Sequence, residues 1–174
     1  VIDAIANPVT RIVSFTVTEK GYCRDSSGKL DLTLANEHSL YRFLRDGLRQ
    51  RKQQGLPGVT LLSCDNLAAN GQQLEKLLAQ YLEATEPTLT PWFQQHCSCP
   101  STMVDRIVPA ATAADLDETV SLLGMRDEAA VFTEHFTQWV IEDRFTGPRP
   151  GWQAGGAQFS TDVHSWEIAK LRML

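Results

Sequence analysis

The apolar residues of this chain recur at two spacings. Repeats of three and four residues predict amphipathic helices, and short apolar or β-branched runs predict strands. Helices are expected over residues 39–54, 71–84, 113–123 and from 165 onwards, with a short helix after residue 91 and a helix end at residues 1–6. Strands are expected over residues 11–18, 59–63 and 130–143, and briefly over 159–163. The strand–helix–strand–helix order of the first half favours a parallel α/β sheet.

An apolar run stops abruptly after Leu62, where small polar residues precede the next helical pattern. In an open α/β sheet such a junction lies at the carboxyl end of a strand, where ligands bind. An uncharged amide such as that of Asn66 can donate there to a carbonyl or alkoxide oxygen. Asp65 has a second interpretation, because Asx residues at such turns often simply cap the following helix.

Two adjacent charges, Asp105 and Arg106, interrupt the apolar run at residues 103–108. Burying a charge is costly unless it is paired or faces a cleft. The sequence leaves two interpretations open: an internal ion pair, or contact with a substrate.

Composition limits the class of protein. A chain of 174 residues that is 43% hydrophobic can bury one sizeable core, so one domain or one piece of a domain is expected. The net charge of −5 and the absence of a clustered basic run argue against a nucleic-acid partner. We expect no membrane partner and a cytoplasmic location, because no apolar stretch is long enough to cross a bilayer and the first residues do not resemble a signal peptide.

The four cysteines are too few for a disulfide framework in a chain of this length. Cys97-x-Cys99 lacks the second ligand pair that a structural zinc site needs. Reduced thiols and no bound metal are therefore expected.

Five motifs occur in one order along the chain. They are Thr16-x-Thr18-Glu19-Lys20-Gly21-Tyr22, Ser63-Cys64-Asp65-Asn66 with Asn70-Gly71, Met103-Val104-Asp105-Arg106-Ile107, Gln138-Trp139-Val140-Ile141-Glu142-Asp143, and Glu167-x-x-Lys170-Leu171-Arg172. Together they resemble the mannitol dehydrogenase family, the zinc-independent long-chain polyol and sugar-acid dehydrogenases. Five ordered motifs are much more specific than any one of them, and they span essentially the whole chain. Residues 104–112 and 170–174 look closest to the fructuronate reductase (D-mannonate oxidoreductase) branch.

The resemblance implies an α/β fold built from the second part of a Rossmann-like dinucleotide-binding domain, with a parallel sheet and family insertions. This domain would cover residues 1–164, and residues 165–174 would be the first turns of a helical C-terminal domain. The family's glycine-rich G-x-G-x-x-G loop does not occur in the sequence. The family's K-x-x-x-x-N-x-x-H motif would open at Lys170 and run past the last residue. We therefore expect an internal fragment of a longer enzyme.

The resemblance also implies catalytic roles for three residues. Lys170 matches the catalytic lysine, which exchanges the proton of the substrate hydroxyl as hydride moves to or from the nicotinamide of NAD, or alternatively of NADP. Such chemistry requires an amine whose pKa is lowered towards neutrality. Asn66 matches one of two asparagines that hold the reacting oxygen. Glu167, one helical turn before the lysine, is suited to proton exchange with solvent.

The remaining predicted site residues line the pocket. Val104 and Asp105 match positions beside the substrate and the nicotinamide, and Arg106 is expected to join them as a substrate-binding residue. Asn66 and Val104 are also expected to contact the cofactor. No metal is expected at the site.

The favoured function is therefore the interconversion of D-mannonate and D-fructuronate by a fragment of an NAD-dependent oxidoreductase. A mannitol 2-dehydrogenase or another polyol dehydrogenase of the same family is the alternative. A different class also stays open: a non-catalytic sugar-acid binding module, with Asn66, Asp105 and Arg106 as ligand contacts, or an inactive structural fragment. The sequence leaves the oligomeric state open.

Overall fold

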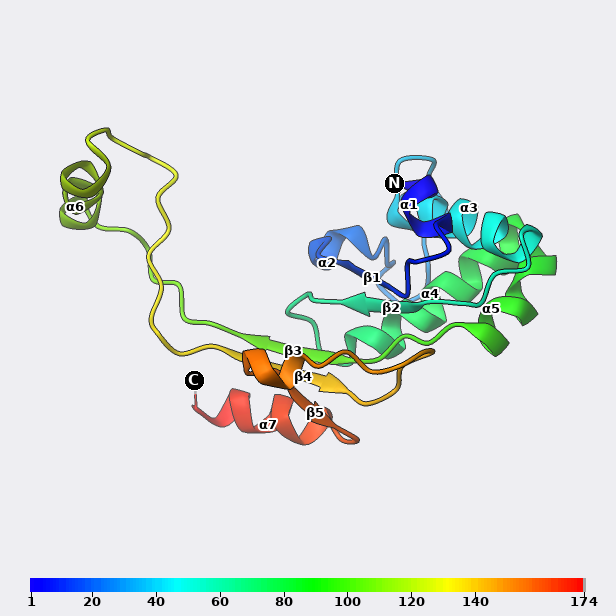
Figure 1. Cartoon of the computed structure of the whole chain (residues 1–174). Coiled ribbons are helices and arrows are strands. Elements are labelled where there is room, and N and C mark those ends of the chain that lie inside the picture. The colour runs from blue at the N-terminus through cyan, green and yellow to red at the C-terminus, as the bar shows by residue number, and fades with distance from the viewer. Residues whose placement is uncertain (174) are drawn as a thin grey trace.

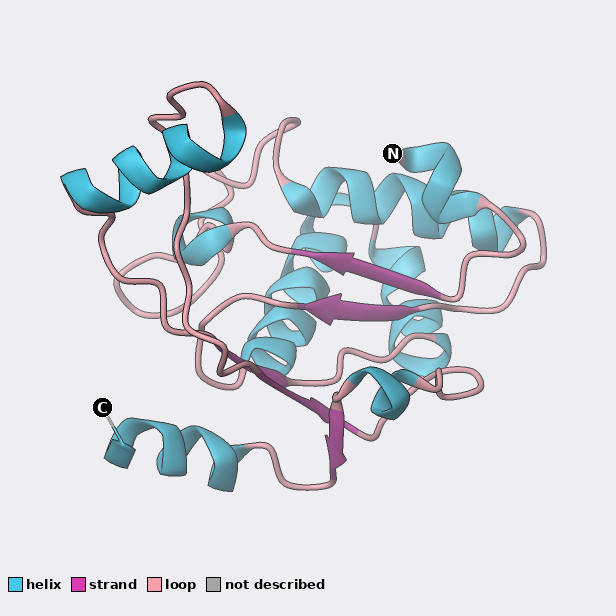
Figure 2. Ribbon diagram, turned by 60° about the vertical axis from the view of Figure 1, so that its left-hand side comes forward, coloured by secondary structure: helices cyan, strands magenta, loops and turns pink. Residues whose placement is uncertain are grey.

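The computed structural model describes the backbone of residues 1–173 and the side chains of residues 1–171 (Figure 1). Its strands form two small sheets flanked by helices (Figure 2). The first sheet pairs β1 (Ile12–Phe15) with β2 (Thr60–Ser63) in parallel. The second sheet contains β3 (Thr102–Asp105), β4 (Gln138–Glu142) and β5 (Gln158–Ser160). β4 is antiparallel to β3 and parallel to β5, so this sheet is mixed.

The main core lies between the first sheet and the helices α3 (Leu40–Gln53) and α4 (Asn70–Thr85). Each helix buries a stripe of apolar residues spaced three or four apart, which is why its sequence forms an amphipathic helix. Tyr41 of α3 stacks on Tyr81 of α4 with ring centroids 5.6 Å apart. The core therefore joins two helices that follow different strands of one parallel pair.

A buried arginine fastens the first helix, α1 (Ile2–Ala6), to α3. Arg51 is 1% exposed and donates 2.8 Å hydrogen bonds to the carbonyl oxygens of Ile5, Asn7 and Pro57. The Asn7 carbonyl also accepts the N–H of Thr10 at 3.0 Å. The guanidinium thus ties the end of α1 and the segments around Asn7 and Pro57 to α3.

The two sheets meet along the segment before β3. Thr60 of β2 forms an isolated parallel bridge with Ser98, and Leu61 donates its N–H to the Ser98 carbonyl at 2.8 Å. Leu62 of β2, Ile141 of β4 and Ala157 form a smaller core to which both sheets contribute. The carboxyl ends of β2 and β3 consequently lie beside each other.

The remaining elements connect these layers. Residues 106–137 form an arm that carries helix α6 (Ala113–Leu123) away from the rest of the molecule (Figure 1). Thr112 and Asp115 form a capping box at the start of α6, and Gly124 ends it with φ 70°. The other helices are α2 (Thr18–Gly21), η1 (Pro87–Leu89), α5 (Thr90–His96), α6 (Ala113–Leu123), η2 (Trp152–Gly155) and α7 (His164–Met173).

The structure confirms most of the predicted elements, including the parallel strand pair and the helices over residues 39–54, 71–84 and 113–123. The strand predicted over residues 130–143 is wrong in its first half, because pairing with β3 begins at Gln138. The strand predicted over residues 11–18 ends at Phe15, since α2 starts at Thr18. Within the described residues, no helix is long and apolar enough to cross a membrane.

The arm exposes much of the apolar surface of the molecule. Leu122 is 75% exposed and Leu123 is 59% exposed, with Met125 and Val131 close by in sequence at 67% and 70%. Large apolar side chains gathered and exposed on one segment are typical of interaction surfaces or of association between copies.

We therefore predict that the isolated chain self-associates and binds a dye that reports apolar surface. The double change of Leu122→Ser and Leu123→Ser should reduce both, because it removes the most exposed apolar side chains of α6. Sedimentation velocity and dye fluorescence measure the effect. The same change at Leu32 and Leu34, which are half exposed but lie outside the arm, is the matched control. A sharply monomeric chain without dye binding would contradict the prediction.

Candidate active site

The amine of Lys170 contacts residues at the carboxyl ends of both β2 and β3. Lys170 lies on α7, and its Nζ donates to Asn66 Oδ1 at 3.0 Å and to the Val104 carbonyl oxygen at 2.9 Å. Asp105 Oδ1 lies 3.5 Å from the same nitrogen. Three of the other predicted site residues, separated from Lys170 by at least 65 positions in sequence, therefore meet at one amine.

The contact between Lys170 and Asp105 explains why a charge interrupts the apolar run of β3. Their side chains are 11% and 15% exposed, so each charge has lost most of its water. Internal pairing was predicted as one possibility, but the partner of Asp105 is Lys170. Among the described residues no ion pair joins Asp105 to Arg106, whose Nη2 instead donates to Thr133 Oγ1 at 2.7 Å.

Glu167 attaches α7 to the start of α4. Its Oε1 accepts the N–H of Ala69 at 2.9 Å, and its Oε2 lies 3.4 Å from His164 Nδ1. Ala69 has φ 50°, in the left-handed region that a residue with a Cβ rarely adopts. A carboxylate beside a helix N-terminus is favourable, so Glu167 stabilises this strained turn from another element.

Asp65 does not cap the helix that follows it, as one interpretation of the sequence held. Its Oδ1 accepts the N–H groups of Val17 and Thr18 at 2.9 and 2.7 Å, which places the carboxylate at the start of α2. Its Oδ2 accepts the hydroxyl of Tyr22 at 3.1 Å. Burial raises the pKa of the Tyr22 phenol, so this hydroxyl remains a donor. Asp65 thereby fastens the loop of Asn66 to the segment after β1.

A cavity of about 290 Å³ lies next to the lysine amine. It is bounded by residues 65–68 after β2, residues 102–104 of β3, and Glu167, Lys170 and Leu171 of α7. Apolar groups and a few convergent polar groups of this kind are typical of small-molecule sites. Arg106 belongs to an adjoining hollow, which it shares with Asn66, Asp105 and Lys170.

Comparison with known proteins identifies the family of the chain. A family model described as the mannitol dehydrogenase Rossmann domain matches residues 1–154. The chain belongs to the mannitol dehydrogenase family. Its Rossmann-like α/β fold, which the resemblance implied, is shown by solved structures of the family.

Three similar proteins illustrate the match. The chain is 44% identical to the D-mannonate oxidoreductase of Escherichia coli (strain K12), over 100% of its own length and 38% of that protein. The crystal structure of a substrate-free D-sorbitol dehydrogenase superposes with a TM-score of 0.87 at 34% identity, covering 99% of this chain and 38% of the other. A Pseudomonas fluorescens mannitol 2-dehydrogenase in a ternary complex with NAD and D-mannitol gives a TM-score of 0.81 at 37% identity, covering 95% and 36%. The chain thus spans about two-fifths of the length of these relatives.

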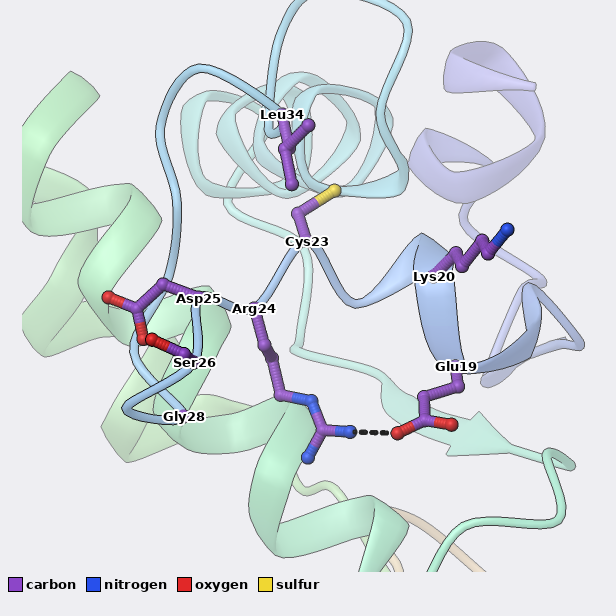
Figure 3. Close-up of a pocket in the computed structure, with 8 residues that line it drawn as sticks. All are labelled: Glu19, Lys20, Cys23, Arg24, Asp25, Ser26, Gly28 and Leu34. Atoms are coloured by element: carbon purple, nitrogen blue, oxygen red, sulfur yellow. Dashed lines mark hydrogen bonds and ion pairs between the residues drawn. The ribbon is translucent and has the colours of Figure 1, made fainter.

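A second hollow is lined by residues between Glu19 and Leu34, none of which is a predicted site residue (Figure 3). It is lined by the segment after β1, where Arg24 pairs with Glu19 at 2.9 Å. Arg24 also donates to Gln73, whose own amide donates to the Ala68 carbonyl oxygen. These contacts connect the segment to the loop of Asn66 through α4.

The four cysteines are free thiols. Burial raises the pKa of Cys97 to about 11 and that of Cys99 well above its ordinary value. Both thiols are therefore protonated and poorly nucleophilic near neutral pH.

Reasoning from the sequence missed two polar residues that support the site, Asn70 and Thr102. Asn70 is fully buried and exchanges hydrogen bonds with both the main chain and the side chain of Thr102. The sequence did contain a sign of Asn70, because the Asn70-Gly71 pair belongs to one of the five motifs, but no role was assigned to it.

The contacts of Asp65 lead to a stability prediction. Tyr22→Phe removes the hydroxyl that bonds to Asp65 and, at 2.5 Å, to Ser63 Oγ. We expect the free energy of unfolding to fall by about 1–3 kcal/mol, because a buried carboxylate loses a donor. Chemical denaturation measures this change. Tyr81→Phe is the control, since its hydroxyl meets Arg45 at the longer distance of 3.5 Å. Equal losses for the two variants would contradict the prediction.

Proposed function

We propose that this chain carries the proton-transfer part of the active site of an NAD-dependent sugar-acid or polyol dehydrogenase. The observation that carries the proposal is the placement of the Lys170 amine, within 3.0 Å of Asn66 Oδ1 and beside a cavity. Under this proposal residues 1–164 belong to the dinucleotide-binding domain and residues 165–174 open a helical second domain. The cytoplasmic location also stays a prediction.

Lys170 exchanges the proton of the reacting oxygen. When the carbonyl is reduced, its ammonium donates a proton to the oxygen on which negative charge develops. When the alcohol is oxidised, the neutral amine accepts that proton. The amine needs no metal for this role, which supports the expected zinc independence.

Asn66 holds the same oxygen. Because its Oδ1 accepts from Lys170 at 3.0 Å, its Nδ2 is left to donate to the substrate. A fixed amide donor stabilises developing negative charge without reorganising during the reaction. One side chain thus orients the lysine and binds the oxygen on which the lysine acts.

Glu167 passes the proton between Lys170 and solvent. It lines the cavity beside Lys170 and also a smaller hollow that contains the exposed His164. A carboxylate that touches both spaces is suited to exchange protons between them.

The residues present fit the nicotinamide end of NAD. When bound, NAD accepts or supplies the hydride. Parallel strands β1 and β2 end at one edge of the first sheet, where dinucleotides bind in such folds, and Asn66 follows β2 at that edge. Asn66 and Val104 of β3 both line the cavity. The sequence contains no G-x-G-x-x-G loop for the pyrophosphate, so we assign only the nicotinamide contacts to this chain. NADP remains the alternative.

We favour D-mannonate and D-fructuronate as the substrate pair. The similarity to a D-mannonate oxidoreductase supports this choice, as does the exposed Arg106 at the rim of the site. A guanidinium suits the carboxylate of a sugar acid, which a polyol lacks. Under this assignment Val104, Asp105 and Arg106 contact the sugar. A polyol such as mannitol is the second candidate, supported by the similarity to mannitol 2-dehydrogenase.

The isolated chain should show no nicotinamide-dependent turnover. Its sequence contains neither the pyrophosphate loop nor the asparagine and histidine that the resemblance places after Lys170. The measurement is fructuronate or fructose reduction with reduced cofactor, with a full-length enzyme of the family as the positive control. Turnover above a blank would contradict this expectation and favour a complete site within these residues.

In a full-length enzyme that contains this segment, Lys170→Ala and Asn66→Ala should fail in different ways. Loss of the amine should lower turnover by about 10²–10⁴-fold, the usual contribution of a positioned proton-transfer group. Loss of the amide should cost about 10²–10³-fold, as for an oxyanion donor. Steady-state kinetics with D-fructuronate measures both.

Added small amines provide the control for these roles. They should partly restore Lys170→Ala, because a free amine can carry a proton, and they should leave Asn66→Ala unchanged. Near-normal turnover of Lys170→Ala, or equal rescue of the two variants, would contradict the assignment.

A further inference from the structure

Asn70 lies between the two strands that supply the acceptors of Lys170. It is the first residue of α4 and is fully buried. Its Nδ2 donates to the Asp65 carbonyl oxygen at 2.9 Å, to the Thr102 carbonyl oxygen at 3.0 Å and to Thr102 Oγ1 at 3.1 Å. Its Oδ1 accepts the Thr102 N–H at 2.8 Å. The amide therefore has partners on both sides of the junction.

These partners belong to the two segments that form the lysine site. Asp65 directly precedes Asn66, and Thr102 begins β3, two residues before Val104. The bridge between β2 and its neighbour lies further back, at Thr60 and Ser98. At the carboxyl end of β2, side chains connect the two segments in place of backbone hydrogen bonds. The Asn70 amide bonds to both segments, and Thr102 Oγ1 donates to the Ser63 carbonyl oxygen at 2.6 Å.

Gly71 allows this close approach. A Cβ at Gly71 would lie 2.4 Å from the Pro100 carbonyl carbon and 2.5 Å from the Cys99 carbonyl oxygen. Both are backbone atoms of the segment leading to β3, so they could not move aside cheaply. The Asn70-Gly71 pair therefore lets the start of α4 lie against the backbone of the segment that leads to β3. This places the Asn70 side-chain amide between that segment and the end of β2.

We propose that Asn70 is a positioning residue, which fixes Asn66 and the Val104 carbonyl oxygen at the separation that Lys170 spans. This inference rests on the function proposed above. Losing the amide would leave the buried Thr102 N–H without its acceptor and the Asp65 carbonyl with the Leu67 N–H as its remaining donor, and the loop of Asn66 would lose its tie to Thr102 and shift. A displacement of about 1 Å in a reacting group can cost on the order of 10²-fold in rate.

The test is Asn70→Ala in the full-length enzyme, at a temperature well below unfolding. We expect kcat to fall by about 10–100-fold with a smaller change in KM, because the reacting groups are misplaced. Thr60→Val is the matched control. It removes a buried hydroxyl that bonds to Ser98 and to the Thr146 N–H at the other end of β2, so it should destabilise the protein and leave kcat unchanged. Equal loss of kcat in the two variants overturns the proposal.

A double-mutant cycle separates positioning from general damage. If Asn70 acts through Asn66, Asn70→Ala should cost less than threefold further in kcat once Asn66→Ala is present. Full additivity of the two losses overturns the proposal. Should Asn70→Ala fail to fold, the same cycle with Thr102→Val decides. Valine keeps the shape and main chain of Thr102 and removes two contacts of the junction, one with the Asn70 amide and one with the Ser63 carbonyl oxygen.

A second measurement keeps the positioning role distinct from the proposed function. In the isolated chain, Asn70→Ala should accelerate hydrogen exchange at the amides of Thr102 and Leu67 more than Thr60→Val does. Unchanged exchange overturns the proposal whether or not the enzyme is active. If the unsubstituted enzyme turns over neither sugar acids nor polyols, the proposed function fails, and faster exchange still supports the fixed junction.

Discussion

The structure depends on a junction where side chains replace the main-chain ladder between two strands. β2 and the segment leading to β3 start side by side at Thr60 and Ser98, but β3 itself belongs to the second sheet and pairs with β4 instead. The hydrogen-bonding groups that such a divergence exposes would be costly if left unpaired. Thr102 and Asn70 satisfy them, and the space opened between the diverging strands is the one that Lys170 enters.

The helix that carries the lysine is held to this junction mainly through polar contacts. Lys170 bonds to β3 and to the loop after β2, and Glu167 bonds to the first turn of α4. Trp166 adds apolar packing against the second sheet, whereas Ile168 and Leu171 remain exposed. Polar contacts specify direction and distance more sharply than apolar packing does, because hydrogen bonds weaken steeply when misaligned. The position of the amine is thereby tied to the two strands.

The sequence predicts those features that local chemistry dictates. Spacing places α3 and α4 because each must bury one apolar stripe. Lys170, Asn66 and Glu167 were named through the family resemblance of their motifs, and the structure places all three around one cavity. The sequence cannot predict features set by distant partners. The carboxylate of Asp65 looked like a local cap, but it serves backbone groups 47 and 48 residues earlier. Residues 130–137 have strand-like composition, yet the partner strand β3 is too short to pair with them.

The charge on Asp105 follows from the same constraint. A lysine enclosed by a carbonyl and an amide oxygen has two of its three N–H directions filled, and the carboxylate at 3.5 Å is the longest of its contacts. Under the proposed function, an entering substrate oxygen would displace this longest contact first and leave Asn66 and Val104 in place. The pair also limits the cost of burying the amine before substrate arrives, since each charge compensates the other. A neutral residue at this position would leave the strand more apolar but the lysine less well placed.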